Sequence, residues 1–319
     1  MKKKLIALFC AAIALMMLLS ACGKSGTEMT MGTGGSSGTY YVFGGALANV
    51  ISDKTDVKIT VVATDGSKDN LINIGTGTYQ LGTVQNDVMA YAYEGTNTFA
   101  ETGAVTNFRV IGALYNEQIQ IITVDPAIKS VADLKGKTVS IGAAGSGVYF
   151  NAVQILDAYG LTENDITPVY QSFADSAESL KDGKIDAAFI TAGAPTNAVA
   201  ELATSKEINL VEIDDEHADI LIAACPYYTK TTIAADVYNT PADAKTVTVK
   251  ATLVVSADAS EDDVYAITKA MFENIDEITQ AHAKGAELSL ESAVQGVSVP
   301  FHSGAAKYYA EQGIEVPTK

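Results

Sequence analysis

Two glycine-rich segments of similar design, at 29–41 and 138–150, are the parts of this chain best suited to bind a ligand. Each combines a short strand-like run, a loop of glycine and hydroxyl residues, an aromatic residue and a helix pattern. The start of a helix exposes unpaired N–H groups and the positive end of the helix dipole, and glycine lets a small anion approach them. Two such helix ends, one in each half of a two-lobed protein, would clamp a ligand that bears a carboxylate.

The elements that must position these loops alternate between strand and helix, which predicts an α/β protein with mainly parallel sheets. Runs of β-branched and apolar residues predict strands at 57–63, 80–84, 110–114, 119–124, 184–190, 208–213 and 246–255. Apolar spacing predicts helices at 69–74, 87–93, 148–159, 174–180 and 261–281, with short ones at 290–294 and 305–312. Ser260 is expected to cap the helix at 261–281, with Asp263 in the capping-box position. Because α/β proteins bind ligands at the carboxyl ends of their strands, both loops are expected to face one cleft.

The first 22 residues predict an export signal that ends in a lipid-attachment site. Three lysines precede an apolar run at 5–19, which is shorter than the roughly 20 residues of a transmembrane helix. Small residues directly before Cys22 resemble a bacterial lipobox, which implies cleavage there, lipidation of the thiol and anchoring on the extracytoplasmic face of the cell membrane. The alternative is an ordinary cleaved signal with a chance cysteine. We expect a signal peptide at 1–21 and a lipidated tether at 22–28.

Charge and composition exclude several classes of partner. The formal charge of −17 argues against nucleic acid or anionic lipid as a partner of the protein body. Arg109 is the only arginine and is interpreted as a surface or structural charge, so an acidic ligand must rely on backbone N–H groups, hydroxyls and helix ends. Cys225 is the one cysteine beyond the signal and the lipidation site, which rules out an internal disulfide. The three histidines lack the spacing of a zinc site, and we expect no metal and no cofactor.

Seven stretches, found in order between Met29 and Gly313, together resemble the TAXI family, the substrate-binding proteins of one branch of the tripartite ATP-independent periplasmic (TRAP) transporters. They are GTGGSSGTYY at 32–41, TDGSKDNL at 64–71, LGTVQND at 81–87, DLKGK at 133–137, GSG at 145–147, GKIDAAF at 183–189 and VPFHSGA at 299–305.

This resemblance implies a type II periplasmic-binding-protein fold, in which two α/β lobes are joined by two crossing strands, here near 115–119 and 247–253. Lobe 1 is then expected to comprise 29–117 and 248–319, and lobe 2 to comprise 118–247. The resemblance also implies a small carboxylate ligand such as glutamate, glutamine or 2-oxoglutarate, and delivery to integral-membrane TRAP permease subunits. We expect a monomer without enzymatic activity.

The candidate ligand-binding residues lie in the two glycine loops, at predicted strand ends and at one crossing. They are Thr33, Gly34, Gly35, Ser36, Gly38, Tyr40, Ser67, Asp87, Tyr115, Glu117, Ser146, Gly147, Tyr149, Thr191, Gly193 and Pro195.

Each candidate also has a purely structural interpretation. The glycines can serve tight turns, and the two tyrosines that follow the loops can belong to the core. Ser67 either faces the ligand or caps a helix. Asp87 either accepts a hydrogen bond from a ligand ammonium or complements a helix dipole. Glu117 either attracts an ammonium or stabilises the hinge.

Other functions remain as alternatives. A binding protein of an ATP-driven importer and a sensory receptor are both compatible with the same two-lobed pattern. An enzyme that uses a nucleotide is disfavoured, because the first loop lacks the third glycine of the dinucleotide fingerprint and no Walker lysine follows either loop.

Overall fold

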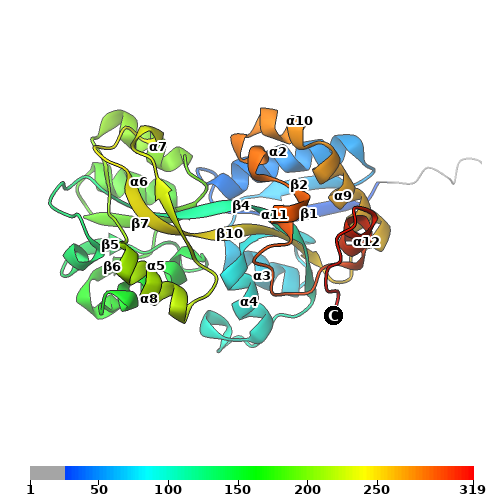
Figure 1. The fold of residues 1–319 in the computed structure, drawn as a ribbon, viewed down its shortest axis with the longest axis horizontal. Helices are drawn as coiled ribbons and strands as arrows, with labels where there is room; N and C mark the ends of the chain where they lie inside the picture. The colour runs from blue at the N-terminus through cyan, green and yellow to red at the C-terminus, as the bar shows by residue number, and fades with distance from the viewer. Residues whose placement is uncertain (1–25) are drawn as a thin grey trace, which may run out of the picture.

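The computed structural model describes residues 26–319, which form two lobes joined by two long strands (Figure 1). The predicted signal peptide and Cys22 lie outside the described residues. A ten-stranded mixed sheet runs through both lobes in the order β2-β1-β3-β10-β4-β7-β5-β6, with β8 beside β4 and β9 beside β10.

Lobe 1 contains the three parallel strands β1 (Glu28–Gly32), β2 (Lys58–Val62) and β3 (Leu81–Gln85). Its helices come from both ends of the chain, and the short 3-10 helices η1 (Asn97–Phe99) and η5 (Ala283–Glu287) accompany them. They are α2 (Thr39–Lys54), α3 (Ser67–Gly75), α4 (Asn86–Glu94), α9 (Glu261–Glu273), α10 (Ile275–Ala281), α11 (Leu290–Ala293) and α12 (Ser303–Glu311).

Lobe 2 repeats the design with the parallel strands β5 (Thr138–Ser140), β6 (Thr167–Val169) and β7 (Ala187–Ala192). Two further strands, β8 (Asn209–Leu210) and β9 (Thr229–Ile233), pair with the crossing strands. The helices are α5 (Val148–Ala158), α6 (Phe173–Lys181), α7 (Asn197–Ser205) and α8 (Asp215–Ala224), with η2 (Val131–Leu134), η3 (Glu163–Asp165) and η4 (Ala235–Val237). The sheet is buried on both faces, because Phe189 packs in one apolar cluster and its neighbours Ala188 and Ile190 in another.

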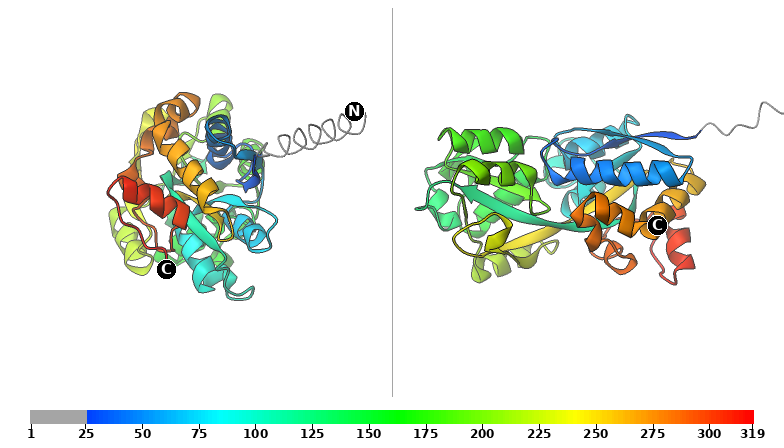
Figure 2. Two further views of the ribbon diagram at one scale, coloured as in Figure 1. Left: turned by 90° about the vertical axis from the view of Figure 1, so that its right-hand side faces the viewer. Right: turned by 90° about the horizontal axis from the view of Figure 1, so that it is seen from above.

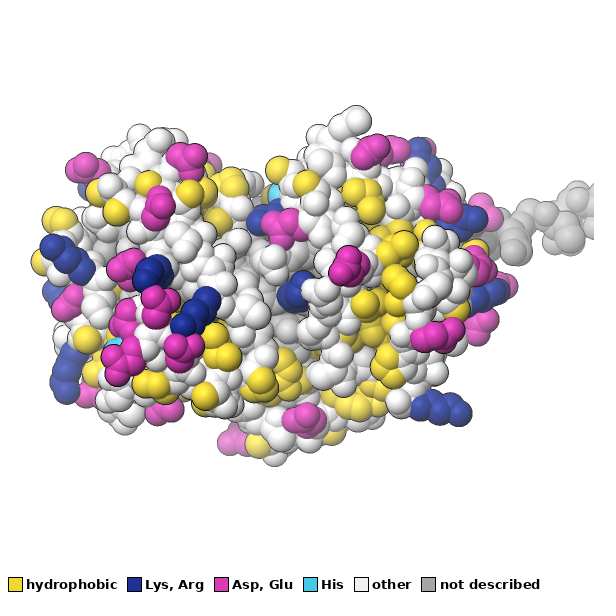
Figure 3. Space-filling view, viewed as in Figure 1, with side chains coloured by type: hydrophobic (Ala, Val, Ile, Leu, Met, Phe, Trp, Pro, Cys, Tyr) yellow, Lys and Arg dark blue, Asp and Glu magenta, His cyan; other side chains and the backbone are white. Residues whose placement is uncertain are grey.

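The crossing strands are β4 (Phe108–Thr123) and β10 (Ala244–Ser256), which pair antiparallel from Phe108–Ser256 to Gln118–Thr248. Seen from above, they run side by side from one lobe to the other (Figure 2). The lobes meet at a waist, visible as the notch in the space-filling view, and acidic side chains are spread over both lobes (Figure 3). The lobe boundaries predicted from the sequence fall inside β4 and β10 and stay a prediction.

The sequence predictions differ from the structure at a few elements. The single helix predicted at 261–281 is wrong, because Asn274 (φ −125°, ψ 32°) leaves the helical region and separates α9 from α10. The Asn274 side chain donates to the Ala270 carbonyl, which is how short polar side chains compete with helix continuation. Ser260 caps α9 as predicted, but the Asp263 carboxylate accepts a hydrogen bond from Thr27.

Three predicted strands also change. The runs at 110–114 and 119–124 are parts of the one strand β4, and the strand predicted at 208–213 shortens to the two residues of β8. Within 26–319 no helix is both long and apolar enough to cross a membrane.

Candidate functional site

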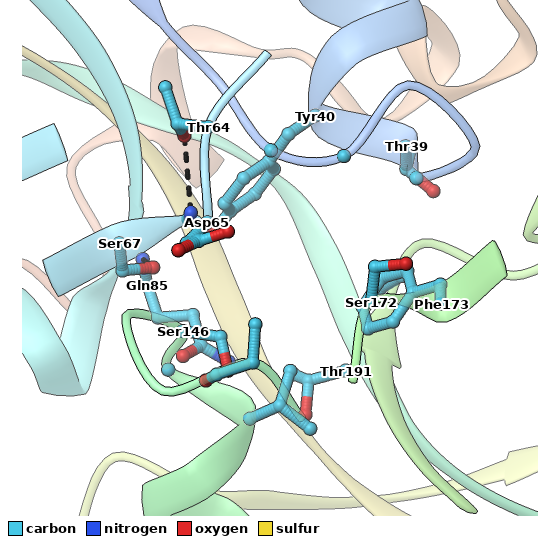
Figure 4. Close-up of a pocket in the computed structure, with 18 of the residues that line it drawn as sticks. Thr39, Tyr40, Thr64, Asp65, Ser67, Gln85, Ser146, Ser172, Phe173 and Thr191 are labelled. Atoms are coloured by element: carbon cyan, nitrogen blue, oxygen red, sulfur yellow. Dashed lines mark hydrogen bonds between the residues drawn. The ribbon is translucent and has the colours of Figure 1, made fainter. Parts of the chain in front are cut away.

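A cavity of about 600 Å³, its open mouth included, lies between the lobes where all six parallel strands end. The last residues of each of these strands, or the loop that follows the strand, contribute to its wall, and Glu117 of β4 completes it. The lining residues are Gly34, Gly35, Gly38, Thr39, Tyr40, Thr64, Asp65, Gly66, Ser67, Gln85, Glu117, Ala143, Ser146, Gly147, Val148, Gln171, Ser172, Phe173, Thr191 and Ala192. Residues of lobe 1 such as Tyr40 and Ser67 face Ser146 and Thr191 of lobe 2 across it (Figure 4). This is where α/β proteins bind ligands.

Three helices begin at this cavity with a glycine as N-cap, and none of the three has a side-chain cap. The N-caps are Gly38 of α2, Gly66 of α3 and Gly147 of α5. At the start of α3 the amides of Lys68 and Asp69 are already hydrogen-bonded to lobe 2, because both donate to the Gly145 carbonyl. The first amides and positive dipole ends of α2 and α5 therefore face the cavity and favour an anionic group there.

The charged side chains that line the cavity are acidic. They are Asp65, at its exposed edge, and Glu117, which is buried with 1% exposure. The Tyr40 hydroxyl donates to Glu117 Oε2 at 2.6 Å. Burial raises the pKa of Glu117 to about 8; the Asp87 carboxylate acts in the same direction, whereas Tyr40 and Lys284 act against it. No lysine, arginine or histidine of residues 26–319 lines this cavity.

Asn151 of α5 connects the lobes behind the cavity. Its Oδ1 accepts from Gln85 Nε2 at 2.8 Å and from Thr191 Oγ1 at 2.9 Å. Its Nδ2 donates to Asp87 Oδ2 at 3.1 Å and to the Tyr228 hydroxyl at 2.7 Å. All four of its hydrogen-bonding positions are used in a fully buried setting, which fixes this side chain in one orientation.

Asp87 is part of this network and carries a second perturbed carboxyl group. It is fully buried, and this burial raises its pKa to about 6 in spite of hydrogen bonds from amides and Asn151. Within the described residues its Oδ1 has no hydrogen-bond partner.

Further hydrogen bonds hold the lobes together around the cavity. The Thr39 hydroxyl donates to the Gly193 carbonyl at 2.9 Å, and the Ala198 amide donates to the Ser37 carbonyl at 3.3 Å. The Cα of Gly147 lies so close to Gln85 that a Cβ there would be 1.3 Å from Gln85 Oε1. The structure therefore represents an arrangement in which the two lobes are in direct contact.

The structure brings nine of the sixteen candidate residues to the cavity wall, from both lobes. They are Gly34, Gly35, Gly38, Tyr40, Ser67, Glu117, Ser146, Gly147 and Thr191. Ser67 Oγ also accepts a hydrogen bond from the Gln85 amide, so it fixes the end of β3.

The other seven candidates do not line the cavity, and several of their side chains make contacts elsewhere. The Thr33 hydroxyl donates to the Val62 carbonyl, and the Tyr149 hydroxyl donates to Glu163. Tyr115 packs edge-on against Phe43 in the lobe 1 core. The remaining four are Ser36, Asp87, Gly193 and Pro195. Ser36 is exposed, Asp87 belongs to the network around Asn151, and the Cα of Gly193 faces the Lys284 side chain.

Several lining residues were not among the candidates. Thr64, Asp65 and Gly66 follow β2, and Ser172 and Phe173 follow β6. A consistent use of the rule that ligands bind at the ends of parallel strands would have selected them, together with Gln85.

Arg109 and the histidines have local structural roles. Arg109 donates to the Thr106 and Phe108 carbonyls. His282 and His302 accept hydrogen bonds from amides at the starts of η5 and α12, and His217 pairs with Asp214 at the start of α8. Among residues 26–319, no three His, Cys, Asp or Glu side chains are grouped as metal ligands would be.

A family model described as NMT1-like matches residues 31–313. The fold is similar to that of the alkanesulfonate-binding protein SsuA from Xanthomonas axonopodis pv. citri bound to MOPS, with 17% identity over 90% of this chain and 91% of that chain and a TM-score of 0.52. A putative L-cystine ABC transporter from Listeria monocytogenes matches with 17% identity over 82% and 98% of the two chains, at a TM-score of 0.52. The substrate-binding protein of an amino acid ABC transporter matches with 13% identity over 82% of this chain and 100% of that chain, at a TM-score of 0.51. These similarities confirm the predicted type II periplasmic-binding-protein fold.

Proposed function

The chain belongs to the NMT1-like family, and from that premise we propose that it is the solute-binding component of a transport system, with its ligand held between the lobes. The observation that carries this proposal is the convergence of all six parallel strand ends on one cavity at the waist. The proteins with a similar fold are named as binding proteins or transporter components, which supports binding without catalysis.

The ligand we propose is a small carboxylate, in the class of glutamate, glutamine or 2-oxoglutarate. Its carboxylate would accept hydrogen bonds from the amides at the starts of α2 and α5, since these helix ends lack side-chain caps. The hydroxyls of Thr39, Ser146 and Thr191 lie around the same space, but they already donate to the Gly193 carbonyl, the Ala143 carbonyl and Asn151 Oδ1, so the helix amides remain the main donors for the ligand. An anionic ligand is also consistent with the alkanesulfonate named for one protein of similar fold.

The proposed mechanism is closure of the two lobes about β4 and β10. In the closed arrangement Gln85 and Asp87 of lobe 1 bond Asn151 of lobe 2, and Thr39 bonds Gly193. Opening would break these bonds and expose the cavity to water. The ligand replaces some of that water and supplies the free energy that favours the closed form.

The membrane partner we propose is an ion-coupled TRAP permease, with the chain anchored by lipid on Cys22. The support is the set of sequence stretches that resemble the TAXI family, of which GTGGSSGTYY and TDGS lie at the cavity. An ATP-driven importer is the second candidate, because two of the proteins of similar fold are named as parts of ABC transporters. Uptake by reconstituted vesicles separates the two: the first requires an ion gradient and the second requires ATP.

A thermal-shift panel of amino acids, oxo acids, dicarboxylates and sulfonates tests the proposed ligand class. A ligand at about 100 times its dissociation constant stabilises the folded chain by about 2.7 kcal/mol, which is a measurable shift. We expect at least one small carboxylate to raise the melting temperature and to reduce the radius of gyration in X-ray scattering. Stabilisation only by solutes that carry no carboxylate would contradict the proposal.

A further inference from the structure

Glu117 is placed where a charged carboxylate is hard to accommodate. It lies on β4 where the strand passes between the lobes, paired with Val249 of β10. The side chain is 1% exposed and forms part of the cavity wall. Oε2 accepts the hydrogen bond from Tyr40, and Oε1 has no hydrogen-bond partner within residues 26–319.

The groups that face Glu117 from the surrounding elements leave its charge uncompensated. Tyr40 of α2 donates one neutral hydrogen bond, and Tyr115 lies two residues earlier on β4. Asp87 at the start of α4 is another buried acid. Among residues 26–319, the cation that acts on Glu117 is Lys284 of η5, whose Nζ is paired with Glu287 Oε1 at 2.6 Å. A buried carboxyl group with these neighbours is favoured in its neutral form, in agreement with a pKa of about 8.

We propose that Glu117 binds the ligand as a neutral carboxylic acid, with its hydroxyl donating to an oxygen atom of the ligand, so that the protein takes up its anionic solute together with a proton. This inference rests on the proposed function, because it assumes an anionic ligand in this cavity. With Tyr40 donating to Oε2, the second oxygen is the one that carries the proton and is free to donate. An ionised Glu117 would place two negatively charged acceptors against each other in a cavity that no basic side chain of residues 26–319 lines.

Glu117 is thereby a specificity-determining residue. A carboxylate or oxo oxygen at this position accepts the hydrogen bond from the acid. An ammonium group would instead require the ionised form, so its binding would release a proton and strengthen as the pH rises. The direction of the pH dependence distinguishes the two modes.

The test is isothermal titration of the full mature chain with 2-oxoglutarate, which has no group that titrates between pH 6.5 and 9.5. Titrations in phosphate and in Tris at each pH measure the protons taken up. For the wild type we expect affinity that is steady below about pH 7.5, falls towards tenfold per pH unit above about pH 8, and is accompanied by proton uptake there. Thermal unfolding at each pH verifies that the chain is folded.

Glu117→Gln is the informative variant, because its amide keeps an acceptor for Tyr40 and a donor for the ligand while it cannot titrate. We expect its affinity at pH 7 to lie within about threefold of the wild type and to stay flat up to pH 9.5. Asp87→Asn is the matched control, which removes the other buried acid and leaves the slope above pH 8 in place.

Several results would overturn the inference, and three of them concern the Glu117→Gln protein or the sign of the pH dependence. They are a Glu117→Gln protein that keeps the wild-type slope, a folded one that loses more than a hundredfold in affinity at pH 7, and wild-type affinity that rises with pH. If the folded wild type binds no carboxylate at any pH, the proposed function fails and this inference fails with it. Binding that is independent of pH refutes this inference alone.

Discussion

Gly147 lies where the two lobes are in tight contact, and replacing it with alanine tests the proposed closure directly. The added Cβ would lie 1.3 Å from Gln85 Oε1 and 2.9 Å from Val88 Cγ2, both in the opposite lobe. To avoid this overlap, either the lobes stay apart or the Gln85 side chain rotates away from Asn151. Open lobes forgo the closed form, whereas rotation in the closed form leaves the buried Asn151 Oδ1 without one of its two donors, at a cost of about 1–3 kcal/mol.

This cost falls on the closed form, so Gly147→Ala should weaken ligand binding about 5- to 150-fold. The stability of the ligand-free chain should change by less than about 1 kcal/mol, because Gly147 has φ −72° and ψ −20°, a conformation that alanine adopts without strain. Titration calorimetry with the carboxylate selected by the panel measures the first quantity, and urea denaturation measures the second. X-ray scattering at saturating ligand should show a larger radius of gyration for the variant than for the wild type.

Gly35→Ala is the matched control. Gly35 lies in the other glycine loop and also lines the cavity, but a Cβ there meets no atom within 4 Å. We expect its affinity to stay within about threefold of the wild type. The reasoning is refuted if Gly147→Ala binds as tightly as Gly35→Ala and shows the same ligand-induced compaction.

Two further predictions rest on the structure, and one rests on the sequence. Asn151→Ala should lower the free energy of unfolding by about 2–4 kcal/mol in urea denaturation, because it leaves several buried partners unsatisfied. The control Asn73→Ala, on the surface of α3, should lower it by less than about 1 kcal/mol. Equal losses for the two variants would contradict the role of the network. Asp87 binds its proton more tightly in the folded chain than in the unfolded one, so its stabilising contribution is complete below about pH 4 and is lost as the pH rises through about 6, a change of about 3 kcal/mol. Denaturation at pH 4 and 7 should show this loss in the wild type and a smaller one in Asp87→Asn, and an unchanged loss would argue against it. Cys22→Ser should abolish incorporation of radiolabelled palmitate and release the protein from the membrane fraction, and a variant that stays labelled would show that lipid attaches elsewhere.

Local sequence patterns predicted much of the fold because they reflect local physics. The β-branched run at 57–63 became β2, and Gly160, with φ +67°, ends α5 as expected for a residue that tolerates the left-handed region. The break at Asn274 was missed, since the apolar stripe continues through it and the competing hydrogen bond to Ala270 is a single local event.

The candidate site was harder to predict, because its walls come from seven segments that only the tertiary fold brings together. The loop glycines and Glu117 were selected from local signals, and both glycine loops do reach one cavity. Tyr149 was selected by analogy with Tyr40, but the helix that carries it is oriented so that its hydroxyl reaches Glu163. Asn151 carried no sequence signal, because its importance arises from partners up to 77 positions away.

A crystal structure of the mature chain with 2-oxoglutarate or L-glutamate bound is the most direct test of the central claim. The account predicts a ligand carboxylate within hydrogen-bonding distance of the amides at the start of α2 or α5, between closed lobes. A ligand that sits outside the waist, or one whose carboxylate is held chiefly by Arg109 or a lysine, would contradict it.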